Sequence, residues 1–146
     1  MPATSTYSFL DLSGAVAHPA LGAYTFTGEG VGEVVISSAT EKSSHDVAAD
    51  GSILVSKIAG NNGSISISVQ QNSPVDTWLL AAYNYLINAN ADEWAQMAAT
   101  LRSASFNRTH ILTGMSFQKK PDRSYQAQGQ RVNWVLMVAD IQDLPF

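Results

Sequence analysis

The strictest pattern in the sequence is an alternation of small polar and aliphatic residues between positions 64 and 70. Ile65, Ile67 and Val69 alternate with three serines, and the run ends at Gln70. Successive side chains of a β-strand point to opposite faces of the sheet, so the aliphatic residues share one face and the polar residues the other. The pattern predicts a strand that covers a core on one side and faces water, or a water-filled lumen, on the other.

Weaker alternation of the same kind runs through most of the chain. Gly60, Asn61, Asn62 and Gly63 tolerate positive φ angles, and they predict a tight hairpin turn before the strand at 64–70. Further strands are expected at residues 7–16, 23–27, 34–40, 52–59, 98–106, 111–119 and 131–141. The sequence therefore predicts one mainly β domain over residues 1–146, a β-barrel or sandwich.

The period changes once, directly after residue 70. Ser73 is a favoured helix N-cap, Pro74 fits the first helical position, and Asp76 places a negative charge in the first turn. An apolar stripe with helical spacing follows, formed by Val75, Leu79, Ala82 and Leu86 and widened by Trp78. We expect one flanking helix at about 74–88 that packs on the body through Val75, Trp78, Leu79 and Leu86.

Charge is sparse and unevenly distributed. Only 14% of the residues are charged, whereas about a quarter are charged in a typical soluble domain, and neighbouring molecules that cover the surface are one common reason. Residues 1–100 contain nine acidic and two basic residues, and residues 101–146 contain six basic and three acidic residues. This split is either ordinary surface charge or a sign of oppositely charged faces that meet when identical subunits stack head to tail.

The residues that carry chemistry do not form a recognisable site. The sequence has no motif for binding phosphate, zinc or a dinucleotide, no catalytic serine motif and no cysteine. His18, His45 and His110 have no metal-ligand spacing, and the glycine-rich stretch at 28–32 lies between strands, which favours a turn or bulge. No apolar run approaches the roughly 20 residues of a membrane span. We expect no enzyme, no cofactor, no metal and no membrane partner.

Three tryptophans allow two interpretations. Trp78, Trp94 and Trp134 could form a platform on which sugars stack, or they could pack in a core or an interface. They share no strand face and have no interleaved arginines, which favours packing. A carbohydrate- or receptor-binding β-sandwich is the alternative function.

Three stretches of sequence carry a likeness to a known family. They are residues 63–69 followed by Asn-Ser-Pro-Val at 72–75 and Ala-Tyr-Asn at 82–84, the stretch at 129–140 with its Trp134 strand, and Tyr-Ser-Phe-Leu-Asp-Leu at 7–12. In this order and spacing the chain resembles the tail tube proteins of contractile-tailed bacteriophages, a family of phage structural proteins. These proteins are similar to the tube subunits of type VI secretion systems and pyocins.

The resemblance implies a tail-tube-like fold that assembles into hexameric rings, stacked into a hollow conduit for DNA ejection. The polar segment at 41–51 is then a protruding loop that reaches the neighbouring ring, and the polar face at 64–70 lines the lumen. The expected inter-ring residues are Glu41, Lys42, Ser44, His45, Asp46 and Asp50, and the expected lumen-facing residues are Ser64, Ser66, Ser68 and Gln70. The directions of Lys57 and Arg131 are left open.

The resemblance also implies partners and a location. Further copies of the chain form the tube, sheath protein surrounds it, and tape-measure protein and passing DNA occupy it. Baseplate and tail-terminator proteins contact its two ends. The expected location is the virion tail, after synthesis and assembly in the host bacterial cytoplasm.

Overall fold

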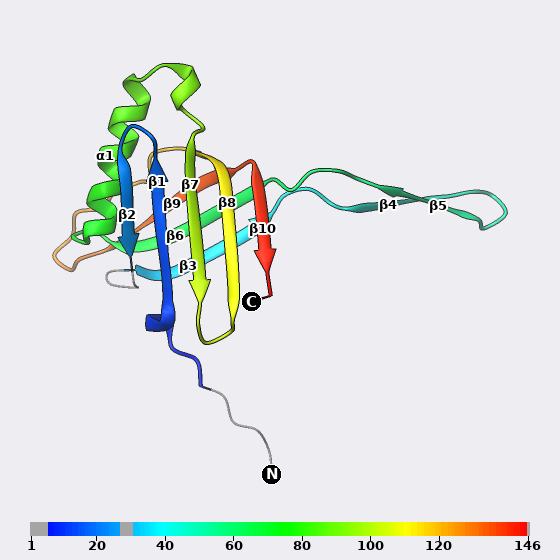
Figure 1. Cartoon of the computed structure of the whole chain (residues 1–146), viewed down its shortest axis with the longest axis horizontal. Coiled ribbons are helices and arrows are strands. Elements are labelled where there is room, and N and C mark those ends of the chain that lie inside the picture. Colours follow the sequence, from blue (N-terminus) through cyan, green and yellow to red (C-terminus); the bar gives the residue numbers. More distant parts are fainter. Residues whose placement is uncertain (1–5, 27–30, 146) are drawn as a thin grey trace, which may run out of the picture.

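The computed structural model describes residues 6–26 and 31–145. This part of the chain contains ten β-strands and one α-helix, α1 (Pro74–Asn88), so the expected mainly β class is confirmed (Figure 1). The strands are β1 (Leu12–His18), β2 (Gly22–Phe26), β3 (Val31–Ser38), β4 (Ser43–Val47), β5 (Ile53–Lys57), β6 (Gly63–Gln70), β7 (Met97–Ser103), β8 (Arg108–Phe117), β9 (Arg131–Val138) and β10 (Asp140–Leu144).

Eight strands form one antiparallel sheet that folds into two layers. The order is β2-β1-β7-β8-β9-β6-β3, and β10 also pairs with β8. We call β2, β1, β7, β8 and β10 the front layer, and β9, β6 and β3 the back layer, whose strands cross behind them (Figure 1). Strand β8 connects the layers, because its first half pairs with β10 while Ser116 and Phe117 pair with β9.

The change of layer occurs where Gly114 meets Ala139. Gly114 has a φ of +65°, and a Cβ atom at this position would lie 2.6 Å from the Cβ of Ala139. The backbone N–H of Ala139 donates to the carbonyl oxygens of Thr113 and Gly114, at 3.1 and 3.2 Å. Only glycine combines this positive φ with so close an approach. The expected single strand at 131–141 is therefore wrong: it breaks at Ala139 into β9 and β10.

The hydrophobic core lies between the two layers and under α1. Trp134 is fully buried, and its ring packs edge-on against Phe117, which in turn packs edge-on against Tyr83 of the helix. The aliphatic face of β6 is buried and its serines are half-exposed. Other large buried side chains are Ile65, Ile67, Leu79, Leu86, Met97, Leu101, Leu112, Met115 and Leu136. Each such side chain stabilises the fold by roughly 1.5–3 kcal/mol.

Helix α1 has the bounds that its sequence signals indicate. The Ser73 hydroxyl accepts a hydrogen bond from the Asp76 N–H at 3.3 Å, which satisfies one free donor of the first turn. Val75, Leu79 and Leu86 are buried, and Trp78 is half-buried with its ring 6.0 Å from that of Tyr24 in β2. The helix therefore closes one end of the sandwich.

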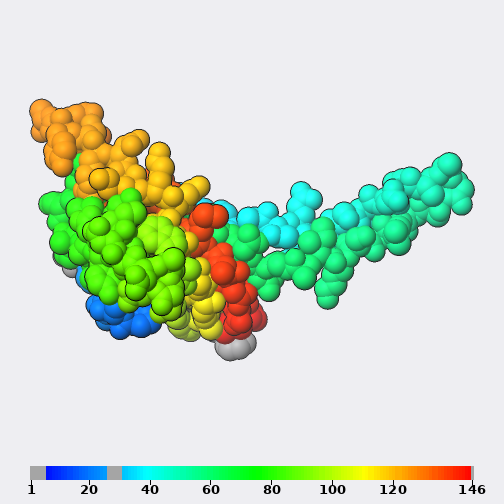
Figure 2. Space-filling view, turned by 90° about the horizontal axis from the view of Figure 1, so that it is seen from above, coloured from blue at the N-terminus to red at the C-terminus, as the bar shows by residue number. Residues whose placement is uncertain are grey.

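Strands β4 and β5 form a long hairpin that leaves the body (Figures 1 and 2). We call residues 43–57 the arm. Its tight turn lies at 48–52, where Gly51 has a φ of +89°. The polar protrusion expected at 41–51 contributes one strand and most of this turn. The strand expected at 52–59 contributes the other strand, Ile53–Lys57.

The tight hairpin turn expected at residues 60–63 is wrong. Strand β6 pairs with β3 and β9, whereas β5 pairs with β4, so these residues connect the arm to the body. The Asn61 carbonyl accepts from the Ile141 N–H at 2.9 Å, and the Asn62 carbonyl accepts from the Ala39 N–H at 3.0 Å. The turn-forming residues 60–63 therefore lie at the base of the arm, where the chain passes from β5 to β6.

The start of the chain and the glycine-rich stretch also differ from expectation. The strand expected at 7–16 begins instead with a short 3-10 helix, Phe9–Asp11, followed by β1. Residues 28–30 of the glycine-rich stretch lie outside the described residues. Gly32 lies at an irregularity in β3, because the pairing with β6 shifts between Val31 and Glu33. A turn or bulge was expected at 28–32, and the described part of it contains such a bulge.

Candidate functional site

The outer face of the back layer, which is turned away from the core, carries the expected lumen-facing residues. Ser64, Ser66 and Ser68 are half-exposed there and Gln70 is exposed. The Ser66 hydroxyl donates to the Asn133 side-chain oxygen at 2.7 Å. The four residues form one row along β6, in the middle strand of the layer.

The strand register divides this outer face into an apolar half and a polar half. Ser64 stands between Ser37 and Met137, and Ser66 stands between Val35 and Val135. Three of these four neighbours are apolar, and Val35 and Met137 are 41% and 50% exposed. Beside Ser68 and Gln70 stand Glu33, Asn133 and Arg131. The apolar half is nearer the arm, since it contains the residues that follow Gly63. The residues of β6 alone do not reveal these two halves, because the difference comes from their neighbours on β3 and β9.

Arg131 points outward on the polar half. Its guanidinium lies over Gly32, where a Cβ atom would come within 2.0 Å of the Arg131 Nη1. The missing side chain of Gly32 therefore makes room for the arginine. Lys57 lies on the arm and not on the outer face. Of the two basic residues whose directions the sequence left open, Arg131 is on the outer face and Lys57 is not.

The back layer has open edges on both sides. Among the described strands, β3 pairs only with β6, and residues 131–134 of β9 pair only with β6. The Val135 carbonyl accepts from the Gln118 N–H at 3.1 Å, where β8 ends. Open strand edges can pair with another chain, and monomeric proteins usually protect them.

The polar residues expected to bridge rings are distributed along the arm and its base. Lys42 donates to the Asn61 side chain at 2.7 Å, so it holds the base. Asp50 lies in the turn, where its carboxylate accepts from the hydroxyl and the N–H of Ser52 at 2.5 and 3.0 Å. The Ser52 hydroxyl is the main reason that the pKa of Asp50 is lowered below 3.8. Glu41, Ser44, His45 and Asp46 are all exposed.

The arm also exposes aliphatic side chains that sequence reasoning assigned to an ordinary strand. Val47, Ile53 and Val55 are 65%, 55% and 58% exposed, and Leu54 is also exposed. The pairs Val47–Ile53 and His45–Val55 alternate with Asp46–Leu54, so Val47, Ile53 and Val55 share one face. No local signal in the sequence separates these residues from a strand of the body.

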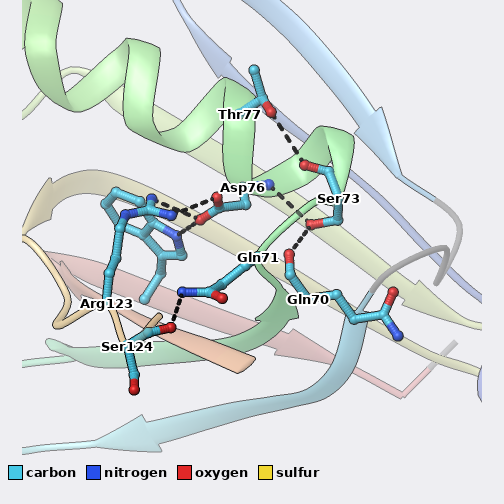
Figure 3. Close-up of polar contacts among 8 residues, drawn as sticks. Gln70, Gln71, Ser73, Asp76, Thr77, Arg123 and Ser124 are labelled. Carbon is cyan, nitrogen blue, oxygen red and sulfur yellow. Dashed lines mark hydrogen bonds and ion pairs between the residues drawn. The ribbon is translucent and has the colours of Figure 1, made fainter. Parts of the chain in front are cut away.

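A buried polar cluster anchors the longest segment without regular structure, which follows β8 (Figure 3). We call residues 118–130 the anchored loop. The Arg123 guanidinium donates to both carboxylate oxygens of Asp76 at 2.9 and 3.0 Å, and the Trp134 Nε1–H donates to the same carboxylate at 2.9 Å. The Gln71 amide donates to the Ser124 carbonyl at 3.0 Å. Sequence reasoning explained Asp76 as a helix-start acid and missed this cluster.

The sequence profile of the Bacteriophage PhiTE tail tube protein family matches residues 4–144. The chain belongs to this tail tube family. The resemblance drawn from the sequence is thereby confirmed, and the chain is a structural component of a phage tail tube. No curated protein matches it by sequence.

Solved structures of contractile injection systems share the fold of this tail tube protein. A chain of the anti-feeding prophage tube-terminating cap aligns with a TM-score of 0.61 at 8% identity, and covers 99% of this chain and 94% of its own. A chain of an extracellular contractile injection system, the PVC sheath–tube complex in the extended state, gives 0.58 at 8% identity, with 95% and 91% covered. A chain of the anti-feeding prophage baseplate, 6-fold symmetrised, gives 0.57 at 10% identity, with 99% and 96% covered.

The histidines of the tail tube protein are placed for structural contacts. His18 is buried at the end of β1, where its Nδ1 accepts from the Ala20 N–H at 3.0 Å and its Nε2 donates to the Glu93 carbonyl at 2.9 Å. His110 pairs with Asp143 at 2.6 Å on neighbouring strands. His45 lies on the arm. The described residues contain no group of three metal-ligating side chains.

The tryptophans do not form an exposed platform in the described structure. Trp134 is buried, and Trp78 and Trp94 pack against the core. This arrangement gives no support to the sugar-binding alternative. No helix in the described part of the chain is long and apolar enough to cross a membrane.

Proposed function

We propose that copies of this tail tube protein form hexameric rings that stack head to tail into a hollow conduit for DNA ejection. The observation that carries the proposal is the back layer, which has a serine row on its outer face between two open edges. If the β3 edge of each copy pairs with the β9 edge of the next, and the copies are related by a rotation, the contacts can close a ring. The strands then form a closed barrel, which has no free edge. The serine row then faces the lumen.

The polar half of the outer face suits a conduit for DNA. Contacts between phosphates and basic side chains hold nucleic acid, so a wall with few of them lets DNA pass. On the strands of the back layer this face presents one acid, Glu33, and one base, Arg131. In the proposed ring the apolar half is nearer the arm, where neighbouring copies meet.

The arm links successive rings in this proposal. A two-stranded hairpin without further packing is marginally stable in water. All residues from 41 to 57 are exposed in the single copy, so the arm lacks such packing within its own chain. Contact with an adjacent ring would supply it, through the expected residues Glu41, Lys42, Ser44, His45, Asp46 and Asp50 together with the exposed aliphatic side chains.

The proposed partners follow from the same architecture. Sheath protein lies outside the tube, tape-measure protein and DNA lie inside, and baseplate and terminator proteins contact the ends. Support comes from the shared fold with chains of a sheath–tube complex, a 6-fold symmetrised baseplate and a tube cap. The tube is part of the virion tail, and we infer synthesis and assembly in the host bacterial cytoplasm.

Removal of the arm tests the link between rings. Ser43 and Lys57 are paired, and the Ile58 N–H donates to the Lys42 carbonyl at 2.9 Å, so a short glycine-rich turn can replace residues 43–57. We expect a folded body with an unchanged melting temperature, single rings in electron micrographs, and no stacked tubes. Tubes of normal length after this replacement would contradict the assignment of the arm.

A further inference from the structure

The arm and the anchored loop lie at opposite ends of the molecule. In Figures 1 and 2 the arm leaves one end of the long axis, and the loop, coloured orange, forms the other end. When identical subunits stack head to tail, one end of each copy meets the opposite end of the next. The two segments are therefore the pair of surfaces that a stacked contact brings together.

The tip of the arm is apolar and acidic. Val47 and Ile53 are more than half exposed and face each other across the hairpin. Residues 46–52 contain two acids, Asp46 and Asp50, and no base. A surface that receives this tip needs an apolar recess with at least one available basic side chain.

The anchored loop offers such a recess. A hollow of about 460 Å³ is lined by Leu80, Lys120, Pro121, Asp122, Arg123 and Tyr125. Tyr125 is 88% exposed and Leu80 is half-buried, so both present apolar surface. Arg123 is neutralised by Asp76, whereas Lys120 and Asp122, one charge of each sign, form no ion pair within the described residues. The recess thus combines apolar surface with an available positive charge.

The loop is held in place before any partner arrives. Pro121 is buried, and the Arg123–Asp76 pair fixes the middle of the loop to the first turn of α1. A surface ordered in advance loses less conformational entropy on binding.

We propose that the arm tip of one copy docks in this recess of a second copy in the adjacent ring. Val47 and Ile53 pack against Leu80 and Tyr125, and Asp50, in the turn at the tip, lies toward Lys120. This inference rests on the proposed function, since it names the surface that receives the arm.

Disulfide trapping tests the contact, because the chain has no cysteine of its own. A tagged Val47→Cys protein is mixed with Tyr125→Cys protein, assembled and oxidised, and dimers are separated on a denaturing gel. The matched control is Phe106→Cys, at another exposed aromatic residue, 58% exposed. We expect a mixed dimer with Tyr125→Cys in assembled tubes and its loss when the tubes are dissociated. Tubes that give no such dimer, or a dimer with Phe106→Cys instead, would overturn the inference.

A charge exchange provides a second measurement that does not need cysteine. Asp50→Lys and Lys120→Glu should each raise the concentration needed for assembly about two- to fivefold, the change expected of an exposed ion pair. The double variant should return to the wild-type value, whereas simple addition of the two defects would contradict the pairing. Assembly of the wild-type protein is tested first. Wild-type protein that never forms tubes would refute the proposed function and not only the docking contact.

Discussion

Arg123 donates to both carboxylate oxygens of Asp76, which lies 47 residues earlier in the chain. The Asp76 side chain is almost fully buried, and Trp134 donates to it from the core strand β9. One carboxylate therefore joins the helix, the core and the anchored loop. A buried carboxylate needs such partners, because desolvation of an unpaired charge is costly.

Arg123→Met should destabilise the protein by about 2–4 kcal/mol, because it leaves the buried Asp76 carboxylate with Trp134 as its remaining side-chain donor. Urea unfolding of the unassembled protein measures this change. Arg108→Met is the matched control. Arg108 is exposed, and among the described residues its guanidinium donates only to the Phe106 and Asn107 carbonyls of its own turn, so a change within about 0.5 kcal/mol is expected. Equal effects of the two substitutions would show that the pair does not anchor the loop.

Gly114→Ala should destabilise the protein by about 1–3 kcal/mol, since it forces a side chain into a positive-φ position against Ala139. Gly129→Ala is the control, because nothing lies within 4 Å of its added Cβ and its φ lies outside the left-handed region. That change should be neutral or stabilising by up to about 1 kcal/mol. Thermal unfolding of both variants measures the two changes. A neutral Gly114→Ala would contradict the role of Gly114 in the change of layer.

The combined variant Val47→Ser and Ile53→Ser should raise the concentration at which tubes form, without a change in the melting temperature of the single copy. Both side chains are exposed before assembly, and burial of each contributes roughly 1–3 kcal/mol in the assembled tube. Light scattering against concentration measures the shift. Ser56→Ala, on the other face of the arm, is the control. An unchanged assembly threshold would mean that the apolar face of the arm stays in water.

Ser52→Ala should raise the pKa of Asp50 toward 3.8, because the Ser52 hydroxyl is the largest cause of its lowering. A carboxyl group whose pKa is lower in the folded state stabilises that state above its unfolded pKa, and this contribution is lost as the pH falls through the folded pKa. The turn of the arm should therefore loosen at acidic pH. Carbon NMR titration of the Asp50 carboxyl group measures the midpoint, with Ser56→Ala as control. The same midpoint in both variants would disprove the role of the hydroxyl.

Local signals explain which parts of the fold the sequence could predict. Ser73, Pro74 and Asp76 act on the helix that they begin, so the bounds of α1 are predictable from neighbouring residues. The buried face of β6 is predictable for the same reason, because the period-two pattern is confined to seven residues.

Features that depend on distant residues were out of reach. Ile53 to Val55 have the composition of a body strand, and only the absence of a covering layer places them on an arm. The break between β9 and β10 requires Gly114 to lie opposite Ala139, and these two residues are 25 positions apart in the sequence. The Asp76–Arg123 pair has no periodic signature. Pairings of this kind are set by the tertiary fold, which single-sequence periodicity does not encode.

A cryo-electron microscopy reconstruction of the purified wild-type protein at high concentration tests the central claim most directly. The account predicts a hollow tube of stacked rings, with the row Ser64, Ser66, Ser68 and Gln70 on the lumen wall. A protein that stays monomeric under all assembly conditions, or a tube with this row on its outer surface, would contradict it.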